Sequence, residues 1–264
     1  MILDQIIAAK QQQLQLEMET TPQADLMTQL DEIEYCPTSF RHALLGQEKL
    51  AIIAEVKKAS PSKGVIKVDF NPVAIAQEYA QNQVAAISVL TESQFFLGSN
   101  AYLREIRSSV RLPLLRKDFI IHPYQVYQSR LLGADCILLI VAVLQKQRLQ
   151  ELLQLAKSIA LQCLVEVHNH RELMVALECQ AEMIGINNRN LQTFVTELQT
   201  TEQLMQEMPK NQVVVSESGI HTLKDLMYLQ SIGVHGVLIG ESLMRSPSIT
   251  HKLMELRGEN IGES

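Results

Sequence analysis

An acidic and a basic residue directly follow one apolar run in this chain, where they could carry out proton transfer together. The run Ala51–Ala54 has the composition of a buried strand and leads directly into Glu55 and Lys57. Because side chains alternate across a strand, Glu55 and Lys57 point to the same side. The loop that follows, SPSKG at 60–64, is rich in hydroxyls and positive charge, which suits an anionic ligand.

Polar residues, and in one case a glycine, also end the later apolar runs. They are Thr91 and Glu92, Lys117 and Asp118, Glu166 and His168, Asn187, Asn188 and Arg189, Glu217 and Ser218, and Gly240 and Glu241. The run Ile137–Val141 is wholly apolar. Charged groups that are withdrawn from water together must pair or take part in chemistry. We therefore expect two amine–carboxylate sets against an apolar wall, as suits proton transfers on a partly hydrophobic, anionic substrate.

Some of these residues have a structural alternative. Glu55 and Lys57 could form an ion pair with no part in chemistry. Arg116 alternates with Lys117 along the strand, so it is predicted to be the outward, solvated neighbour. Asp118 could bond neighbouring backbone or cap the next loop.

Two further pairs and the cysteines also have simpler interpretations. Asn187 and Asn188 could be turn formers. His168 and His170 have the spacing of a metal-binding His-x-His, but they open a predicted helix away from the carboxylate set, and we expect no metal. The cysteines lie far apart without CxxC pairing and are predicted to be buried free thiols; they are Cys36, Cys136, Cys163 and Cys179.

Two glycines at the ends of later runs indicate a phosphate site. Gly219 lies in the segment SESGI at 216–220, and Gly240 lies in LIGES at 238–242. Glycine lets backbone N–H groups approach an anion, and the helix predicted after Gly240 adds free N–H donors. We expect a phosphate between these two loops.

A repeating pattern of strand, turn and helix must position all of these residues. Strands are predicted at 52–56, 85–90, 114–117, 136–141, 163–167, 183–186, 213–216 and 236–239. Helices are predicted at 72–81, 100–109, 123–132, 146–160, 170–178, 199–208, 221–231 and 242–257. Eight such units predict an α/β fold, a (β/α)₈ TIM barrel, whose strand ends converge on one mouth. A doubly wound open sheet is the alternative, although no glycine-rich dinucleotide fingerprint follows the first strand.

The repeating part is preceded by a helical extension. Residues 1–20 have an amphipathic helical pattern, a polar break follows around 20–25, and 39–45 form a second short helical piece. We divide the chain into an N-terminal extension at 1–49, a catalytic barrel at 50–258 and a C-terminal tail at 259–264.

The composition limits the class of protein. The 264 residues are 47% hydrophobic and 20% charged, with a net charge of −6 and a pI near 5.7. This charge provides no basic field for nucleic acid, and no apolar run reaches the roughly 18 residues of a membrane span. The first residues lack the features of a secretion signal, so we expect a cytoplasmic protein without membrane or nucleic-acid partners.

Eight ordered segments resemble the indole-3-glycerol-phosphate synthase family of tryptophan biosynthesis. They span about residues 40–247 and read IIAEVKKASPSKG, SVLTESQFFLGS, LLRKDFIIHPYQV, GADCILLIV, LVEVH, IGINNRN, VSESGI and GVLIGESLMR. The resemblance implies a carboxy-lyase that acts on 1-(2-carboxyphenylamino)-1-deoxyribulose 5-phosphate. It closes the indole ring with loss of CO₂ and water, without metal or organic cofactor. Association with other enzymes of that pathway is left open.

The resemblance also implies roles for the site residues. Lys117 would protonate the ketone oxygen during ring closure, and Lys57 would bind the carboxylate and act as acid in the dehydration. Glu55 and Glu166 would accept protons or hold the lysines, and which of them is the base stays open. Asn187, Glu217 and Ser218 would orient polar groups of the substrate, and Arg189 would support that side of the site. Gly219, Gly240, the backbone at Glu241 and Ser60 would hold the phosphate. Phe96, Phe119 and Leu138 would form the wall against the aromatic ring.

Two positions depart from the family's pattern. Asn190 stands where the family usually has aspartate, which puts a contact of Arg189 in doubt. Glu241 stands where several members have serine, so a phosphate contact there is expected from the backbone.

The alternatives to this function are another phosphate-binding barrel of the phosphoribosylanthranilate isomerase type, a metal-dependent hydrolase using His168 and His170, and a barrel without catalytic activity. The lysine pair argues against the isomerase, whose chemistry usually uses cysteine and aspartate.

Overall fold

Eight parallel strands close into a barrel in the computed structural model, which describes residues 2–33, 36–190 and 193–259. The strands, in the order in which they pair, are β1 (Ala51–Val56), β10 (Gly236–Ile239), β9 (Val213–Glu217), β8 (Met183–Asn187), β7 (Gln162–Val167), β6 (Cys136–Ile140), β5 (Leu114–Lys117) and β4 (Ala86–Leu90). Because β4 pairs with β1, the sheet has no free edge. The predicted barrel is confirmed, and the open-sheet alternative is wrong.

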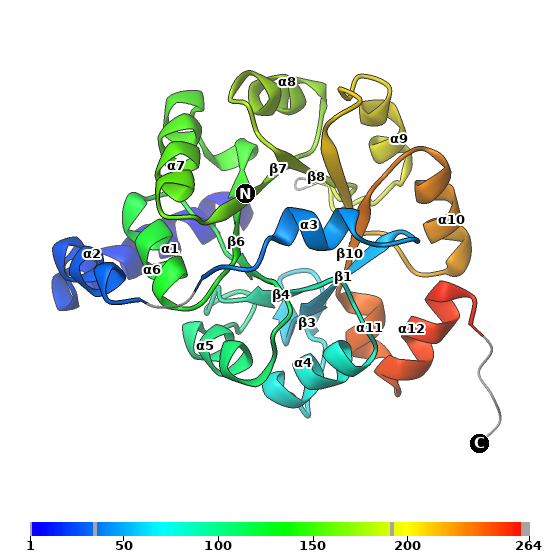
Figure 1. Cartoon of the computed structure of the whole chain (residues 1–264), viewed down its shortest axis with the longest axis horizontal. Helices are drawn as coiled ribbons and strands as arrows, with labels where there is room; N and C mark the ends of the chain where they lie inside the picture. Colours follow the sequence, from blue (N-terminus) through cyan, green and yellow to red (C-terminus); the bar gives the residue numbers. More distant parts are fainter. Residues whose placement is uncertain (1, 34–35, 191–192, 260–264) are drawn as a thin grey trace.

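Helices surround this barrel (Figure 1). They are α4 (Pro72–Gln81), α5 (Asn100–Ser109), α6 (Pro123–Leu131), α7 (Lys146–Ser158), α8 (His170–Glu178), α9 (Gln199–Met205), α10 (Leu223–Ser231), α11 (Glu241–Arg245) and α12 (Ile249–Arg257), with a 3-10 turn η1 (Val141–Val143) after β6. The single helix predicted at 242–257 is wrong, because Pro247 cannot donate a backbone hydrogen bond and disfavours helical geometry before it. Ser248 then caps α12 by accepting a hydrogen bond from the His251 N–H.

The extension forms helices before the barrel begins. They are α1 (Ile2–Thr20), α2 (Gln23–Asp31) and α3 (Phe40–Leu45), and α2 occupies part of the predicted polar break. A short hairpin of β2 (Ala59–Ser60) and β3 (Gly64–Val65) forms in the loop after β1. Met1 of the predicted first helix and residues 260–264 of the predicted tail lie outside the described residues.

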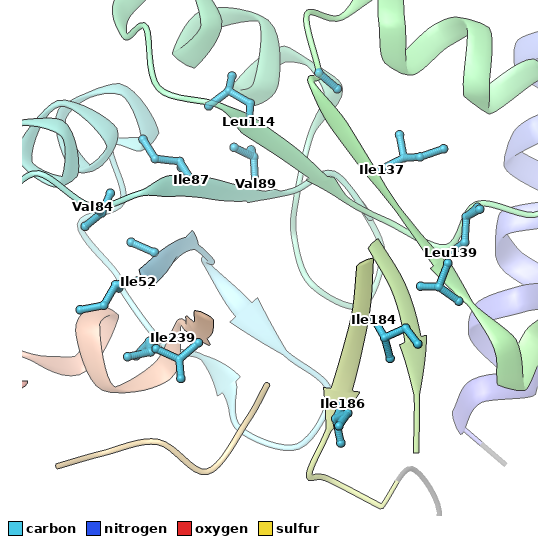
Figure 2. Packing of buried hydrophobic residues seen from close by; sticks show 14 of the residues in the cluster. Ile52, Val84, Ile87, Val89, Leu114, Ile137, Leu139, Ile184, Ile186 and Ile239 are labelled. Atoms are coloured by element: carbon cyan, nitrogen blue, oxygen red, sulfur yellow. The ribbon is translucent and has the colours of Figure 1, made fainter. Parts of the chain in front are cut away.

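Alternation along each strand creates two separate apolar cores. Ile52, Val89 and Leu114 point outward and pack with helix residues in the larger cluster. Figure 2 shows labelled isoleucine, valine and leucine side chains of several strands in this cluster. The other set, including Ile53 and Leu115, fills the barrel interior. Residues two positions further along the same inward face then reach the mouth of the barrel.

Helix α3 closes the opposite end of the barrel, where the strands begin. Phe40 and Leu44 are buried in the interior cluster together with Ala51 and Met183. Figure 1 shows α3 lying across this end of the barrel. The interior is therefore closed by side chains at one end, and the mouth at the other end is left for a ligand.

Arg116 is not the solvated residue that the alternation predicted. Its side chain does point outward from β5, but helices cover that face, and only 1% of the residue is exposed. The guanidinium donates hydrogen bonds to Thr91, Ser129 and Gln128 and lies 3.3 Å from Asp118. In a barrel, "outward" means toward the helix layer, so a charge there must be fully paired.

Lys10 of helix α1 joins this buried network. Its Nζ lies 2.8 Å from Asp118 Oδ1, and the whole residue is 2% exposed. Asp118 is also hydrogen-bonded by Thr91 and by the backbone N–H of Phe119. Lys10 and Arg116 lower the pKa of Asp118 against the effect of burial, which alone would raise it. This cluster ties the extension to the end of β5.

We expect Lys10→Ala to lower the free energy of unfolding by about 3–5 kcal/mol, because it removes one partner of a buried ion pair. The matched control is Lys146→Ala, whose partner Glu178 lies 2.7 Å away on the surface; we expect little change from it. Urea unfolding of both variants measures the difference. Similar losses in the two variants would contradict a stabilising role for the buried network.

The four cysteines are free, but they differ in burial. Cys136 and Cys179 are buried, whereas Cys163 is half-buried and Cys36 is exposed. The prediction of buried thiols is therefore wrong for Cys36, which precedes the barrel and takes no part in its core.

The length and polarity of the helices bear on membrane insertion. Along the described ranges, no helix is both long enough and apolar enough to cross a membrane.

Candidate active site

A cavity lies at the carboxyl ends of the strands, and every residue to which the family resemblance gives a role lines it. These residues are Glu55, Lys57, Ser60, Phe96, Lys117, Phe119, Leu138, Glu166, Asn187, Arg189, Glu217, Ser218, Gly219, Gly240 and Glu241. Of the other polar residues at the strand ends, Asp118 also lines it, whereas Thr91, Glu92, His168 and Asn188 do not. The sequence pattern did not indicate that α1 would contribute Ile2, Leu3 and Ile6 to the same lining. The apolar face of α1 was visible, but nothing in the sequence said where that face would dock.

Lys117 lies between two buried carboxylates. Its Nζ is 2.9 Å from Glu166 Oε2 and 3.0 Å from Glu217 Oε2. These side chains come from β5, β7 and β9, so the contact exists only because the barrel is closed. The Lys117 ammonium is therefore shared by two buried carboxylates.

Burial and charge shift the three groups in different directions. Burial lowers the pKa of Lys117, but Glu166 and Glu217 outweigh this effect and raise it above its ordinary value. Burial raises the pKa of Glu166, but Lys117 and His168 bring it below its ordinary value. Burial raises the pKa of Glu217, and the charge of Glu166 adds to this although Lys117 opposes it. Lys117 and Glu166 are thus both charged, and Glu217 is the easier carboxylate to protonate.

Glu55 and Lys57 form the second amine–carboxylate set. Glu55 Oε2 lies 2.6 Å from Lys57 Nζ, as expected for neighbours on one face of a strand. Gly240 packs against this pair: a Cβ at Gly240 would lie close to the Glu55 carboxylate and 3.0 Å from Lys57 Nζ. A side chain at Gly240 would therefore disturb the pair, whatever its effect on an anion.

Gly185, which is not among the predicted site residues, makes room for Glu217. It lies on the inward face of β8, and a Cβ there would come close to Glu217 Oε1. That oxygen is buried and has no hydrogen-bond partner among the described residues. An isolated glycine within a predicted strand was the available signal, since it often marks the close approach of another group.

We expect Gly185→Ala to lower kcat/KM by about 10²-fold, because it displaces the Glu217 carboxylate by about an ångström or more. Adding Glu217→Asp, which shortens the crowded side chain, should restore part of the loss. Steady-state kinetics of the single variant and the double variant provide the measurement. A Gly185→Ala protein with wild-type kinetics would show that the position of Glu217 is not critical.

The two asparagines after β8 do more than form a turn. Asn187 donates a hydrogen bond to Glu166 Oε1 at 3.3 Å. Asn188 is buried and donates to the backbone oxygens of Glu217 and Ser218. These contacts fix the end of β9, where Ser218 adopts a left-handed φ of 68°.

An apolar wall faces the charged groups. The rings of Phe96 and Phe119 lie 6.2 Å apart between centroids, and Leu138 lies on the same cavity surface. Glu92, which follows β4, holds the loop that carries Phe96: its carboxylate accepts hydrogen bonds from the backbone N–H groups of Gln94, Phe95 and Phe96. Glu92 therefore shapes the wall and does not itself line the cavity.

The loops after β9 and β10 border one side of the cavity. Gly219 has a left-handed φ of 80° directly after Ser218, an arrangement in which successive backbone N–H groups can point at an anion. Arg189 Nη2 lies 3.8 Å from Glu241 Oε2, and Arg245 holds the other oxygen of that carboxylate at 3.0 Å. Asn190, which departs from the family pattern, accepts a hydrogen bond from the backbone N–H of Thr193.

The two histidines considered for metal binding have different partners. The expectation that both lie away from the carboxylates is wrong for His168, which contacts Glu166 and Glu172 because it directly follows β7. His170 is largely exposed and contacts Glu207 at 2.6 Å. Within the described ranges, no group of three or more His, Cys, Asp or Glu side chains is placed to hold a metal ion.

Comparison with known proteins gives a family match over nearly the whole chain. The family model described as indole-3-glycerol phosphate synthase matches residues 3–256. A protein of that name from Alkaliphilus metalliredigens is 53% identical over 257 residues, covering 97% of this chain and 98% of its own. Another, from Acetivibrio thermocellus, is 50% identical over 258 residues, covering 97% and 99%.

Solved structures with low sequence identity share the fold. The N-acetylmannosamine-6-phosphate 2-epimerase from Clostridium perfringens has a TM-score of 0.62 at 12% identity, covering 81% of this chain and 94% of its own. KGPDC from Streptococcus mutans has a TM-score of 0.61 at 11% identity, covering 80% and 97%. At this identity the likeness concerns the barrel alone.

Proposed function

The chain belongs to the indole-3-glycerol phosphate synthase family, a family of carboxy-lyases of tryptophan biosynthesis, and from this premise we propose how its residues divide the reaction. The substrate is 1-(2-carboxyphenylamino)-1-deoxyribulose 5-phosphate, and the products are indole-3-glycerol phosphate, CO₂ and water. This assignment of roles rests on the position of the Lys117 ammonium, which lies between the buried carboxylates of Glu166 and Glu217 in a cavity with an apolar wall.

Lys117 is the general acid of ring closure. The carbon of the aromatic ring that bears the carboxylate attacks the ketone carbon, and Lys117 donates a proton to the ketone oxygen as negative charge develops there. The raised pKa of Lys117 suits this task, because the amine enters the step protonated and the forming alkoxide is a strong base. Phe96, Phe119 and Leu138 line the space for the aromatic ring.

Lys57 acts on the carboxylate and in the later dehydration. Its ammonium, held by Glu55 at 2.6 Å, attracts the substrate carboxylate to the mouth before CO₂ leaves. The loss of CO₂ returns its electron pair to the ring and restores aromaticity. Lys57 then protonates the departing hydroxyl, while a carboxylate takes a proton from the neighbouring methylene. Glu55 and Glu166 are the candidates for this base.

The phosphate lies at the loops after β9 and β10. Backbone N–H groups at Gly219 and Gly240 bind it, with the backbone at Glu241 and with Ser60 from the loop after β1. The Glu241 side chain turns to Arg189 and Arg245, which keeps its negative charge paired beside the anion. Asn187, Ser218 and Glu217 orient the sugar hydroxyls and the ketone.

A turnover assay with purified protein tests this function. The synthetic substrate is mixed with the protein, and indole-3-glycerol phosphate is measured by its fluorescence and CO₂ by its release. We expect the two products in equal amounts. Indole product without matching CO₂ release, or no product from folded protein, would contradict the proposal.

A further inference from the structure

His168 lies beside Glu166, and the chemistry above gives it no role. Its side chain is only 9% exposed. Nδ1 lies 3.0 Å from Glu172 Oε2, and Nε2 lies 3.2 Å from Glu166 Oε1. The imidazole is thus held between two carboxylates, one from the first turn of α8 and one from β7.

The start of helix α8 fixes Glu172 in place. Glu172 donates its backbone N–H to Asn169 Oδ1, and its own Oε1 accepts a hydrogen bond from Asn169 Nδ2 at 2.7 Å. Its Oε2 accepts the backbone N–H of His168 at 2.9 Å. The carboxylate therefore reaches back over the helix end and meets the ring of His168 in one orientation.

This geometry sets the protonation of the ring. An ionised carboxylate has no proton to donate, so a ring nitrogen that pairs with one must carry a proton itself. Nδ1 is hydrogen-bonded with Glu172, whereas the buried Nε2 lies 3.2 Å from Glu166 as a charge contact without hydrogen-bond geometry. A carboxylate beside each nitrogen favours the imidazolium. Burial lowers the pKa of His168, but the neighbouring carboxylates of Glu166 and Glu172 outweigh it and raise the pKa to about 10.

Glu166 connects this ring to the reacting groups. Its Oε1 contacts His168 and accepts a hydrogen bond from Asn187, while its Oε2 contacts Lys117. The charged groups that face this chain of contacts are Glu172 on α8, Lys117 on β5, Glu217 on β9 and Glu55 on β1. With His168 and Asn187 on one oxygen, the other oxygen of Glu166 is directed at Lys117.

We propose that His168 is a positioning residue for the ring-closing reaction, and that its imidazolium holds Glu166 ionised and directed at Lys117. The inference rests on the proposed function, because His168 acts only through Glu166. Its positive charge disfavours transfer of the Lys117 proton to Glu166, so the proton stays available for the ketone oxygen.

The charge of His168 is measured directly by NMR. The ring resonances of the histidines are followed in the wild-type protein from about pH 6 to pH 8.5, around the ordinary histidine pKa. The His168 signal is identified as the one lost in His168→Gln or displaced in Glu172→Gln. We expect it to remain that of an imidazolium across this range. A signal that titrates near the ordinary value of 6.5 overturns the proposal, whether or not the protein makes indole product.

The pH dependence of kcat tests the effect on catalysis. In His168→Gln the neutral amide no longer stabilises ionised Glu166, so the pKa of Glu166 rises and the acid limb should move up by about one pH unit or more. In Glu172→Gln the ring keeps one carboxylate partner and its pKa falls, so activity should instead be lost as pH rises through neutrality.

His170→Gln is the matched control, because this exposed histidine bonds Glu207 outside the cavity. We expect its pH profile to equal that of the wild type. Unchanged profiles in both His168→Gln and Glu172→Gln overturn the proposal. Absence of turnover in the wild type contradicts the proposed function instead, and the NMR titration still reports the charge of His168.

Discussion

Replacing Lys117 with alanine is expected to lower kcat by about 10²–10⁴-fold, the usual contribution of a general acid. The truncated side chain cannot donate a proton to the ketone oxygen. It also leaves the carboxylates of Glu166 and Glu217 without the ammonium that now lies 2.9 Å and 3.0 Å from them. One of these carboxyl groups should then take up a proton, so that the site avoids two unpaired charges. Single-turnover kinetics measure the loss, and circular dichroism checks that the barrel remains folded.

Two further variants separate proton donation from charge. Lys117→Arg keeps a positive group near both glutamates, but a guanidinium holds its proton too tightly to act as an acid. We expect Lys117→Arg to recover more of the stability lost in Lys117→Ala than of the lost activity. Lys157→Ala is the control: it removes an exposed lysine on α7, 83% of whose side chain is in solvent, and should change neither stability nor kcat. A Lys117→Ala enzyme with kcat close to that of the wild type would exclude Lys117 as the acid.

Removing the phosphate from the substrate is expected to lower kcat/KM of the wild-type enzyme by about 10⁴-fold, as in sites whose polar groups are left unpaired by a shortened substrate. The phosphate is remote from the bond that forms. Its binding energy can still hold the ketone against the aromatic ring, so part of the loss should appear in kcat. Steady-state kinetics with both substrates provide the comparison.

Gly219→Ala is the variant that tests where the phosphate binds. Gly219 has a φ of 80°, which strains any side chain, and a Cβ would lie 2.7 Å from the Thr196 side chain, so Thr196 or the loop after β9 must shift. The variant should discriminate less between the two substrates than the wild type does. Gly233→Ala is the matched control, since Gly233 has a φ of 86° and lies after α10, away from the cavity. Gly240 is less suitable, because a side chain there meets Glu55 and Lys57.

Equal turnover of both substrates by the wild type would show that no phosphate site exists between these loops. Equal loss of discrimination in Gly219→Ala and Gly233→Ala would show that strain, and not the phosphate cradle, causes the effect.

The repeating units and the inward-facing residues were predictable from the sequence, because both depend on local periodicity. A strand alternates with period two, so Glu55 and Lys57 must share a face wherever the strand is placed. The same rule put Lys117 and Glu166 on the inner face once the strands were recognised. The starts of α4 and α6 follow from capping residues that precede a proline: Asn71 and His122 each accept a backbone N–H through the side chain.

Closure of the sheet was decided by the tertiary structure. The same eight units could have formed an open sheet, and the pairing of β1 with both β4 and the last strand, β10, excludes that. Closure also determines that Lys117 meets both Glu166 and Glu217, whose strands are far apart in the sequence. The opposite pKa shifts of Glu166 and Glu217 follow from their distances to charged neighbours and from their burial. Neither the distances nor the burial can be read from the spacing of residues along the chain.

The surroundings of side chains on the outer face of the barrel and at its mouth were likewise decided by tertiary packing. Arg116 was correctly placed outside the barrel but wrongly given to solvent, because a sequence pattern does not say that helices cover that face. Lys10 pairs with Asp118, more than a hundred residues away along the chain, and the start of α1 lines the mouth. Gly185 and Gly240 matter for the space that they leave beside Glu217 and Lys57. Local sequence determines which way a side chain points, whereas what it meets there depends on long-range packing.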